Sequence, residues 1–349
     1  MKDKRFSIGI VGAGWVAGAR HAPSYLKDGR ARVEAIYDRD LAKAERLAQR
    51  FSVARATNNL DELLHRAKDA VSICTPPQSH AELALRAMKA GRHVLVEKPM
   101  AMTSDEARAM AATSRATGLQ LCVSHNFLFS RSMTRARQMI DAGKVGEILH
   151  AVALQLSSPR RRLPSWYPEL PGGLFFDEAP HMLYILRSLL GELHVRGAWA
   201  IEASDGGPQP IERLECSLDS GPRTAQLTMS FQAPVSEWLV LVVGSRSALV
   251  IDVFRDMLTV LGSDNRHGSG DVLRSSLSLF AQAAAGFAGS GALHATGRLY
   301  YGHDRLISRF LDGIDGEEQP VALGESLAVM GSMEEIMRTA GISRAGAKV

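Results

Sequence analysis

A glycine-rich turn directly after a short apolar segment is the strongest constraint on the fold of this chain. Residues 7–11 read SIGIV, which is typical of a buried strand, and GAGWVA follows at residues 12–17. This hexapeptide matches the pattern G-x-G-x-x-[GA] between a strand and a helix. Gly12 permits a tight turn, Gly14 lets the backbone approach a pyrophosphate, and Ala17 allows close helix packing. The turn therefore predicts a dinucleotide-binding βαβ unit.

Short apolar segments continue to alternate with helix-compatible segments over the first part of the chain. Strands are expected at 7–11, 33–37, 70–74, 93–97 and 119–123. One helix is expected to end at about residue 26, and three others are expected at 41–51, 79–90 and 103–117. Such alternation predicts a parallel sheet with helices on both faces. We therefore assign residues 1–125 to a Rossmann NAD(P)-binding domain of the α/β class.

An acidic residue at the end of the second strand bears on the choice of cofactor. Asp38 can accept hydrogen bonds from the ribose hydroxyls of NAD, and its charge repels the 2′-phosphate of NADP. Arg39 can pair with that phosphate, so NAD is favoured and NADP stays an alternative. The expected cofactor contacts are Gly12, Gly14, Trp15, Val16, Ala17, Asp38, Arg39, Thr75, Pro76, His80, Glu97 and Lys98.

Two further strands are followed by residues that can contact a ligand. They end at the edge where open α/β sheets bind ligands. The sequence CTPPQSH at residues 74–80 predicts a stiff wall beside a nicotinamide. EKP at residues 97–99 places Lys98 at the same edge, where it can bind a substrate hydroxyl or share in proton transfer. The alternative is that Lys98 forms a surface ion pair with Glu97 or another acid.

Composition excludes several other classes of protein. The chain has 349 residues, of which 46% are apolar, enough for two domains with real cores. Its net charge of +4 is scattered and forms no basic stripe with stacking aromatics, so nucleic acid is not an expected partner. The 3 cysteines are widely spaced and predict neither disulfides nor a metal site. Apolar runs are too short for a membrane span or secretory signal, and a cytoplasmic protein is expected.

Taken in order, the motifs resemble those of the Gfo/Idh/MocA oxidoreductases. They are GAGWVA, CTPPQSH, EKPMAMTSDEA, GKVGEI at residues 143–148, and GG…D…H at residues 172–181. The resemblance covers nearly the whole chain and is densest before residue 148. It implies a second, α+β domain at residues 126–349, with an open, mostly antiparallel sheet, helices on one face, and final helices near the domain junction.

This second domain has matching sequence features. Strand-like runs occur at 149–156, 195–201, 214–218, 225–231, 238–243 and 249–254, and closing helices are expected at 303–312 and 325–339. A helix is expected from about residue 178 to 190, with Asp177 as its N-cap and Pro180 in its first turn. Because the family commonly has D-x-G-x-H, Ala179 and Pro180 are departures that leave the substrate open.

Carried over residue by residue, the resemblance implies three catalytic side chains: Lys98, Asp177 and His181. His181 is expected to be the general base, because the pKa of an unperturbed histidine, about 6.5, suits proton transfer at neutral pH. Asp177 would orient His181 or bind an adjacent hydroxyl, and Lys98 would stabilise a developing alkoxide. Without the resemblance, Asp177 is compatible with both a helix cap and a functional role, and a lone helical histidine such as His181 is more often structural.

The proline-rich segment 157–173 precedes this helix and supplies candidates for substrate binding. It contains three consecutive arginines at 160–162, whose guanidinium groups match carboxylates and phosphates. Its aromatic residues can stack on a sugar ring; the alternative is that the arginines are solvated and the aromatics fill a domain interface. The expected substrate contacts are His125, Asn126, Arg161, Trp166 and Tyr167. Our hypothesis is a carbohydrate-like, anionic substrate.

These features predict an NAD(P)-dependent dehydrogenase or reductase acting on a secondary alcohol or ketone of a sugar, cyclitol or sugar derivative. Two alternatives stay open: a non-catalytic cofactor-sensing protein of the same fold, and an enzyme that uses bound NAD for internal redox in epimerisation or elimination. An open sheet with an apolar face needs a cover, so a homodimer or homotetramer is expected. Residues 262–300 fit no part of this scheme.

Overall fold

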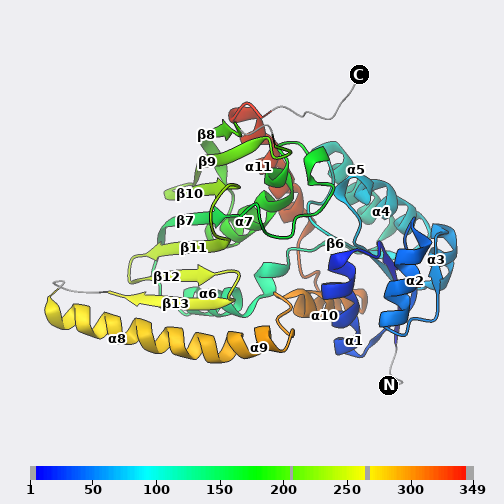
Figure 1. The fold of residues 1–349 in the computed structure, drawn as a ribbon, viewed down its shortest axis with the longest axis horizontal. Coiled ribbons are helices and arrows are strands. Elements are labelled where there is room, and N and C mark those ends of the chain that lie inside the picture. The colour runs from blue at the N-terminus through cyan, green and yellow to red at the C-terminus, as the bar shows by residue number, and fades with distance from the viewer. Residues whose placement is uncertain (1–4, 205–206, 264–267, 343–349) are drawn as a thin grey trace. The chain divides into compact units, whose positions relative to one another are not determined.

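The computed structural model describes residues 5–204, 207–263 and 268–342 of the chain (Figure 1). The chain divides into two compact units, and neither is continuous in sequence. The first contains the residues up to 126 together with 302–331, and the second contains 127–301 together with the residues from 332 on. A segment from the far end of the chain thus belongs with the N-terminal residues, which the sequence does not reveal.

The first unit contains a six-stranded parallel sheet with the order β3-β2-β1-β4-β5-β6. The strands are β1 (Phe6–Val11), β2 (Ala31–Tyr37), β3 (Ala56–Thr57), β4 (Ala70–Ile73), β5 (His93–Val96) and β6 (Leu121–Val123). The chain leaves β1 toward β2 and later returns on its other side to β4, so the strand order reverses between β1 and β4. In such sheets, ligands bind at the carboxyl ends of the strands beside this reversal. The predicted parallel sheet is confirmed. It also contains β3, a strand that the sequence did not predict.

Helices connect these strands. They are η1 (Ala17–His21), α1 (Ala22–Asp28), α2 (Leu41–Arg50), α3 (Leu60–Arg66), η2 (Pro77–Ser79), α4 (His80–Lys89) and α5 (Ser104–Thr117). Helix η3 (Asn126–Phe129) follows the last strand, β6, and α10 (His303–Ile314) comes from the late segment 302–331. Their ends follow local chemistry: the side chain of Asp40 caps α2, that of Thr103 caps α5, and Gly118 ends α5 in the left-handed conformation. The sequence did not predict α3.

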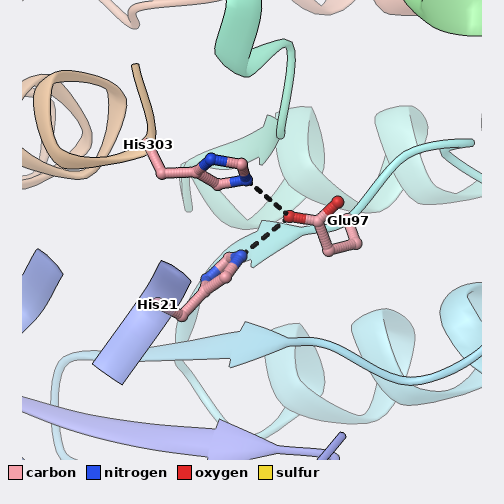
Figure 2. A group of neighbouring side chains, drawn as sticks. All are labelled: His21, Glu97 and His303. Carbon is pink, nitrogen blue, oxygen red and sulfur yellow. Dashed lines mark hydrogen bonds and ion pairs between the residues drawn. The ribbon is translucent and has the colours of Figure 1, made fainter. Parts of the chain in front are cut away.

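Three buried side chains join α10 to the sheet (Figure 2). His303 begins α10, His21 lies at the end of η1, and Glu97 follows β5. Nε2 of His21 lies 2.8 Å from Oε1 of Glu97, and Nε2 of His303 lies 3.5 Å from the same oxygen. On its other side, Nδ1 of His21 lies 3.1 Å from Oγ of Ser72 in β4. One carboxylate oxygen therefore receives contacts from two segments that are remote in sequence.

The electrostatics of this cluster are those of a buried ion pair. Burial alone would raise the pKa of Glu97, but hydrogen bonds from His21 and His303 hold it well below its usual range. Burial alone would lower the pKa of His21, but the Cys74 and Glu97 side chains outweigh burial and raise it. The three ligand atoms lie within 4.8 Å of one another, a donor set that transition metals accept. Because the His21–Glu97 contact has hydrogen-bond length, we interpret the cluster as an ion pair.

The second unit contains a seven-stranded sheet with the order β13-β12-β11-β7-β10-β9-β8. The strands are β7 (Ile148–Leu156), β8 (His194–Glu202), β9 (Ile211–Ser220), β10 (Arg223–Ser230), β11 (Glu237–Gly244), β12 (Ser247–Asp252) and β13 (Met257–Gly262). All neighbouring pairs are antiparallel except β7 and β10, which are parallel. The expected open, mostly antiparallel sheet is confirmed, and β13 is an edge strand that the sequence did not predict.

The remaining helices are α6 (Arg131–Asp141), η4 (Tyr167–Glu169), α7 (Leu174–Leu190), α8 (Ser269–Gly286), η5 (Phe287–Gly291), α9 (Ala292–Ala295) and α11 (Leu323–Thr339). Helix α7 packs against β7 and β10, and all but one of its residues are buried. Its apolar sequence, LFFDEAPHMLYILRSLL, is suited to this position because a helix that is apolar on most sides must be covered on most sides.

Helix α7 begins earlier than predicted. We expected Asp177 as the N-cap and Pro180 in the first turn, but the N-cap is Gly173 and Pro180 lies inside the helix. Asp177 is instead a buried residue of the first turn. The N–H of Leu174 donates to Oε1 of Gln209 at 2.9 Å. The prediction was wrong because this cap comes from a side chain 35 residues away, which local sequence cannot indicate.

We expect Gly173→Ala to destabilise the second unit. Gly173 has a φ of +61°, and an added Cβ would lie 2.4 Å from Oε1 of Gln209, so the cap must move. Gly221→Ala is the control, since its φ is +64° but its Cβ would meet nothing within 4 Å. Denaturant unfolding should show a loss of about 1–2 kcal/mol for the control and a larger loss for Gly173→Ala. Equal losses would mean that the cap is unimportant.

We expect Glu97→Gln to destabilise the first unit by about 3–5 kcal/mol, because it removes one partner of a buried charge pair. Glu62→Gln is the control: Glu62 forms an ion pair with Arg55 on the surface, and its loss should change the unfolding midpoint much less. An unchanged midpoint for Glu97→Gln would contradict the ion-pair interpretation.

The pH dependence of this stability difference follows from the two pKa shifts. The raised pKa of His21 means that its contribution is lost as pH rises above its unfolded value, about 6.5. The lowered pKa of Glu97 means that its contribution is lost as pH falls below about 4.5. The difference between wild type and Glu97→Gln should therefore be largest at about pH 5–6.5 and shrink on both sides.

Candidate functional site

The glycine turn after β1 has one closed side and one open side. Gly12 has a φ of +95°, and a Cβ there would lie 2.8 Å from Cγ2 of Thr75 and 2.9 Å from the backbone nitrogen of that residue. A Cβ on Gly14 would meet nothing within 4 Å. Ala17 is fully buried, as close packing of the following helix requires. The turn is thus packed against the end of β4 at Gly12, while its backbone is open at Gly14.

The residues around this turn differ in exposure. Trp15 is exposed, and the guanidinium of Arg20 lies 4.9 Å from the centre of its ring. Val16 is half-buried at the start of the helix. Arg39 is exposed beside the turn that follows β2. Trp15 and Arg39 are thus exposed, and Val16 is half-buried.

Asp38 braces the glycine turn. Its Oδ2 accepts a hydrogen bond from the N–H of Ala13 at 2.8 Å, and its Oδ1 accepts one from the N–H of Asp40 at 3.0 Å. The carboxylate therefore lies beside the turn, where its charge disfavours an additional phosphate. The sequence did not indicate this contact between Asp38 and the glycine turn.

The ends of β4 and β5 are linked through His80. Its Nδ1 lies 2.9 Å from the carbonyl oxygen of Pro99, and its Nε2 lies 2.8 Å from that of Thr75. Burial lowers the pKa of His80, so the neutral ring donates to one of these carbonyls at a time. Both ring nitrogens of His80 are thus engaged with backbone. Lys98 is half-buried in the turn after β5, directly after the buried Glu97.

Asp177 and His181 lie one turn apart on α7, and both are buried. Nδ1 of His181 lies 2.8 Å from Oη of Tyr184, which also accepts a hydrogen bond from the N–H of Phe127 at 3.2 Å. The imidazole packs against the rings of Phe127 and Trp238 at centroid distances of 4.9 and 5.4 Å. Aromatic side chains therefore fix the position of His181, and a hydroxyl contacts one of its nitrogens.

Sequence reasoning missed Tyr184, Phe127 and Trp238 around His181. Only Tyr184 carried a signal, because it lies three positions after His181 on the same helix, a spacing that brings side chains together. Phe127 and Trp238 come from other elements. Their proximity depends on the packing of the second unit.

Glu178 is another residue that the sequence did not single out. This buried carboxylate accepts hydrogen bonds from Arg161, from Nε2 of Gln155 and, at 3.1 Å, from Oγ of Ser157. Arg161, which we expected to contact an anionic substrate, is thus engaged in an internal ion pair. Burial lowers its pKa, and Asp177 opposes this effect.

The remaining predicted substrate residues lie in both units. Tyr167 is buried in η4 and Trp166 is half-buried before it, both in the segment that precedes α7. His125 and Asn126 are buried after β6. Burial lowers the pKa of His125 to about 3, with Glu97 opposing, so this imidazole is neutral at physiological pH.

Within each unit, the structure brings predicted residues together. In the first unit, the glycine turn, Asp38, Thr75, Pro76 and Lys98 follow strands β1, β2, β4 and β5 at the carboxyl edge of the sheet. In the second unit, Asp177 and His181 share α7, and Arg161 contacts the same helix through Glu178. Among the helices of the described part of the chain, none combines the length and apolar character needed to cross a membrane.

Comparison with curated proteins gives relatives of modest identity. The chain is 34% identical over 197 residues to D-glucoside 3-dehydrogenase of Escherichia coli (strain K12), covering 55% of this chain and 56% of that protein. It is 32% identical over 195 residues to dTDP-3,4-didehydro-2,6-dideoxy-alpha-D-glucose 3-reductase of Streptomyces violaceoruber, covering 55% and 56%. The matched region thus spans little more than half the length of these relatives.

Solved structures share the fold across nearly the whole chain. The WlbA dehydrogenase from Bordetella pertussis, in complex with NADH and UDP-GlcNAcA, superposes with a TM-score of 0.80 at 18% identity, covering 98% of this chain and 97% of that one. GenD2 from gentamicin A biosynthesis, in complex with NAD, gives a TM-score of 0.78 at 21% identity, covering 97% and 95%.

Two family models match separate parts of the chain. Residues 6–125 match the oxidoreductase family with an NAD-binding Rossmann fold, and residues 133–250 match the GFO/IDH/MocA C-terminal domain. Together they cover more than half of the chain. With the parallel sheet, the glycine turn and the mostly antiparallel second sheet, they establish that the chain belongs to the GFO/IDH/MocA family.

Proposed function

We propose that this protein is an NAD(P)-dependent oxidoreductase that moves a hydride between nicotinamide and a secondary alcohol or ketone of a sugar, cyclitol or sugar derivative. The observation that carries the proposal is the glycine turn at the strand reversal, open at Gly14 and braced by Asp38, in a chain of this family. The dehydrogenase and reductase names of the curated relatives support a sugar-like substrate.

The residues of the first unit fit a dinucleotide. The open backbone at Gly14 suits a pyrophosphate, and the carboxylate of Asp38 suits ribose hydroxyls. The bound nicotinamide would accept or supply the hydride. We propose the first unit, which contains the residues up to 126 together with 302–331, as the cofactor unit, and the second unit as the substrate and oligomerisation unit.

We propose Lys98, Asp177 and His181 as the catalytic residues. Lys98 stabilises negative charge on the substrate oxygen, and His181 moves the proton. The Tyr184 hydroxyl can donate to or accept from Nδ1 of His181, so it can follow the imidazole through both protonation states. Asp177 supplies a carboxylate one turn away on the same helix. Because Arg161 is paired with Glu178, we do not assign it to an anionic substrate group.

The test is to mix the purified protein with NAD or NADP and a panel of sugars, glycosides, cyclitols and nucleotide-linked sugars. Formation of reduced nicotinamide with one substrate class supports the proposal. Product without net reduction would identify internal redox, as in epimerisation or elimination. Tight cofactor binding without any product from the panel would favour the sensor alternative.

Asp38→Asn should shift cofactor preference toward NADP. It retains an acceptor for the N–H of Ala13 but removes the charge that repels the 2′-phosphate. We expect the ratio of kcat/KM for NAD to that for NADP to fall at least about tenfold, since like-charge contacts cost several kcal/mol. Arg39→Ala is the control and should leave NAD use unchanged. A wild type that prefers NADP, and loses that preference in Arg39→Ala, would contradict the assignment of NAD.

His181→Asn should lower kcat by about 10²- to 10⁴-fold, the usual range for loss of an acid–base group. Tyr184→Phe should lower kcat by a smaller factor and shift the pH profile of kcat, because it removes only the hydroxyl beside Nδ1 of His181. Circular dichroism and cofactor affinity serve as controls for folding. Unchanged kcat and pH profile in Tyr184→Phe would remove Tyr184 from the mechanism.

A further inference from the structure

Helix α8 is exposed along its whole length. It has 18 residues, Ser269–Gly286, and none of them is buried. It lies beyond residue 250, where the match to the family's C-terminal domain ends, and within the segment 262–300 for which the sequence offered no role. Residues 264–267 of that segment lie outside the described residues. In Figure 1, α8 runs beside β13, the edge strand of the second sheet.

One side of α8 is attached to β13. Oε1 of Gln282 accepts a hydrogen bond from the N–H of Val260 at 2.7 Å, and its Nε2 donates to the carbonyl of the same residue at 3.1 Å. Near the end of the helix, a Cβ on Gly286 would lie 2.3 Å from Cε of Met257, so the two elements touch there. These contacts define the inner side of the helix and leave the opposite side to be explained.

The outer side of α8 carries a continuous apolar stripe. Leu273, Leu277 and Phe280 are 62%, 61% and 75% exposed, and Phe287, the first residue of η5 directly after α8, is 76% exposed. With Ala284 they are spaced by four, three, four and three residues, which is the repeat of a coiled-coil seam. At about 100° per residue the five positions fall within one narrow arc, and Gln282 lies on the opposite side.

The surroundings of this stripe, defined as Leu273, Leu277, Phe280, Ala284 and Phe287, favour a helix as the partner. Its flanking positions hold small, uncharged residues: Ser276, Ala281, Ala283 and Ala288. Small flanks let a second helix approach closely, and the absence of charge there leaves no means of selecting a foreign helix by ion pairs. The stripe is, however, complementary to another copy of itself, as a two-fold interface requires.

The helix macrodipole indicates the direction of pairing. Asp271 and Arg274 are the only charged residues of α8. At about 100° per residue they lie about 160° and 100° from the centre of the stripe, outside the contact surface in either orientation. Two α8 helices in antiparallel orientation bring opposite ends of their macrodipoles together, which is the favourable arrangement.

The area of the stripe is adequate for self-association. Two phenylalanines that are about three-quarters exposed, together with the two leucines, offer on the order of 500 Å² per copy, or about 1,000 Å² in total. That total is near the lower limit for a specific interface.

We propose that α8 is a dimerisation helix that pairs in antiparallel orientation, through its apolar stripe, with α8 of a second copy of this chain. The pairing covers side chains that are otherwise in water. It is independent of the proposed catalytic function, because it uses residues beyond the family match and none of the candidate site.

Sedimentation velocity of the full chain over a range of concentrations tests the proposal. Wild type should be at least dimeric at micromolar concentration. Phe280→Glu and Leu277→Glu should each weaken the dimer by at least about 100-fold and leave the far-ultraviolet circular dichroism unchanged. Ala285→Glu is the matched control, since it adds the same charge to an exposed position of α8 outside the stripe. A monomeric wild type, or dimers that survive both stripe variants, would overturn the proposal.

Oxidative cross-linking tests the orientation. Cys74, Cys122 and Cys216 are buried, so an introduced surface cysteine should react selectively. An equimolar mixture of Leu273→Cys and Phe287→Cys should cross-link as a heterodimer, because antiparallel pairing brings residue 273 of one copy to residue 287 of the other. Efficient cross-linking of Leu273→Cys with itself would instead show parallel pairing and contradict the proposed geometry.

Discussion

A buried carboxylate needs hydrogen-bond or ion-pair partners. In the first unit, the partners of Glu97 join a late segment of the chain to the parallel sheet. Glu97 ends β5 in the interior, where an unpaired charge would cost several kcal/mol. Its partners are His21, 76 residues earlier, and His303 at the start of α10. Meeting the requirement brings a late segment of the chain back to the N-terminal sheet. It also fixes the backbone from which Lys98 emerges.

Polar side chains around the glycine turn and in the second unit also form hydrogen bonds within the protein. Asp38 both braces the turn and supplies the charge expected to select the cofactor. Glu178 accepts hydrogen bonds from Gln155 in β7 and from Ser157 and Arg161 in the segment that precedes α7. In both places, groups that looked available for ligands also satisfy one another, which holds the neighbouring backbone in position.

Helices α7 and α8 have similar apolar content but differ in how far their side chains are buried. Both are rich in apolar residues, and neither carries many charges. Helix α7 is covered on nearly every side, and Asp177 and His181 are buried with it. Helix α8 contacts β13 on one side, and the apolar stripe on its other side is exposed. Periodicity alone does not distinguish these two situations.

Local sequence patterns were enough to predict the alternation of strands and helices, the parallel first sheet, the glycine turn, Asp38 at the end of β2, and the placement of Asp177 and His181 one turn apart on a helix. These features depend on local patterns of side chains and on the ends of strands. Only the packing of the folded chain shows that Gln209 caps α7, that Phe127 and Trp238 lie beside His181, that Arg161 pairs with Glu178, and that His303 contacts Glu97. Each of these contacts unites residues whose proximity is set by packing, so no local pattern in the chain could specify it.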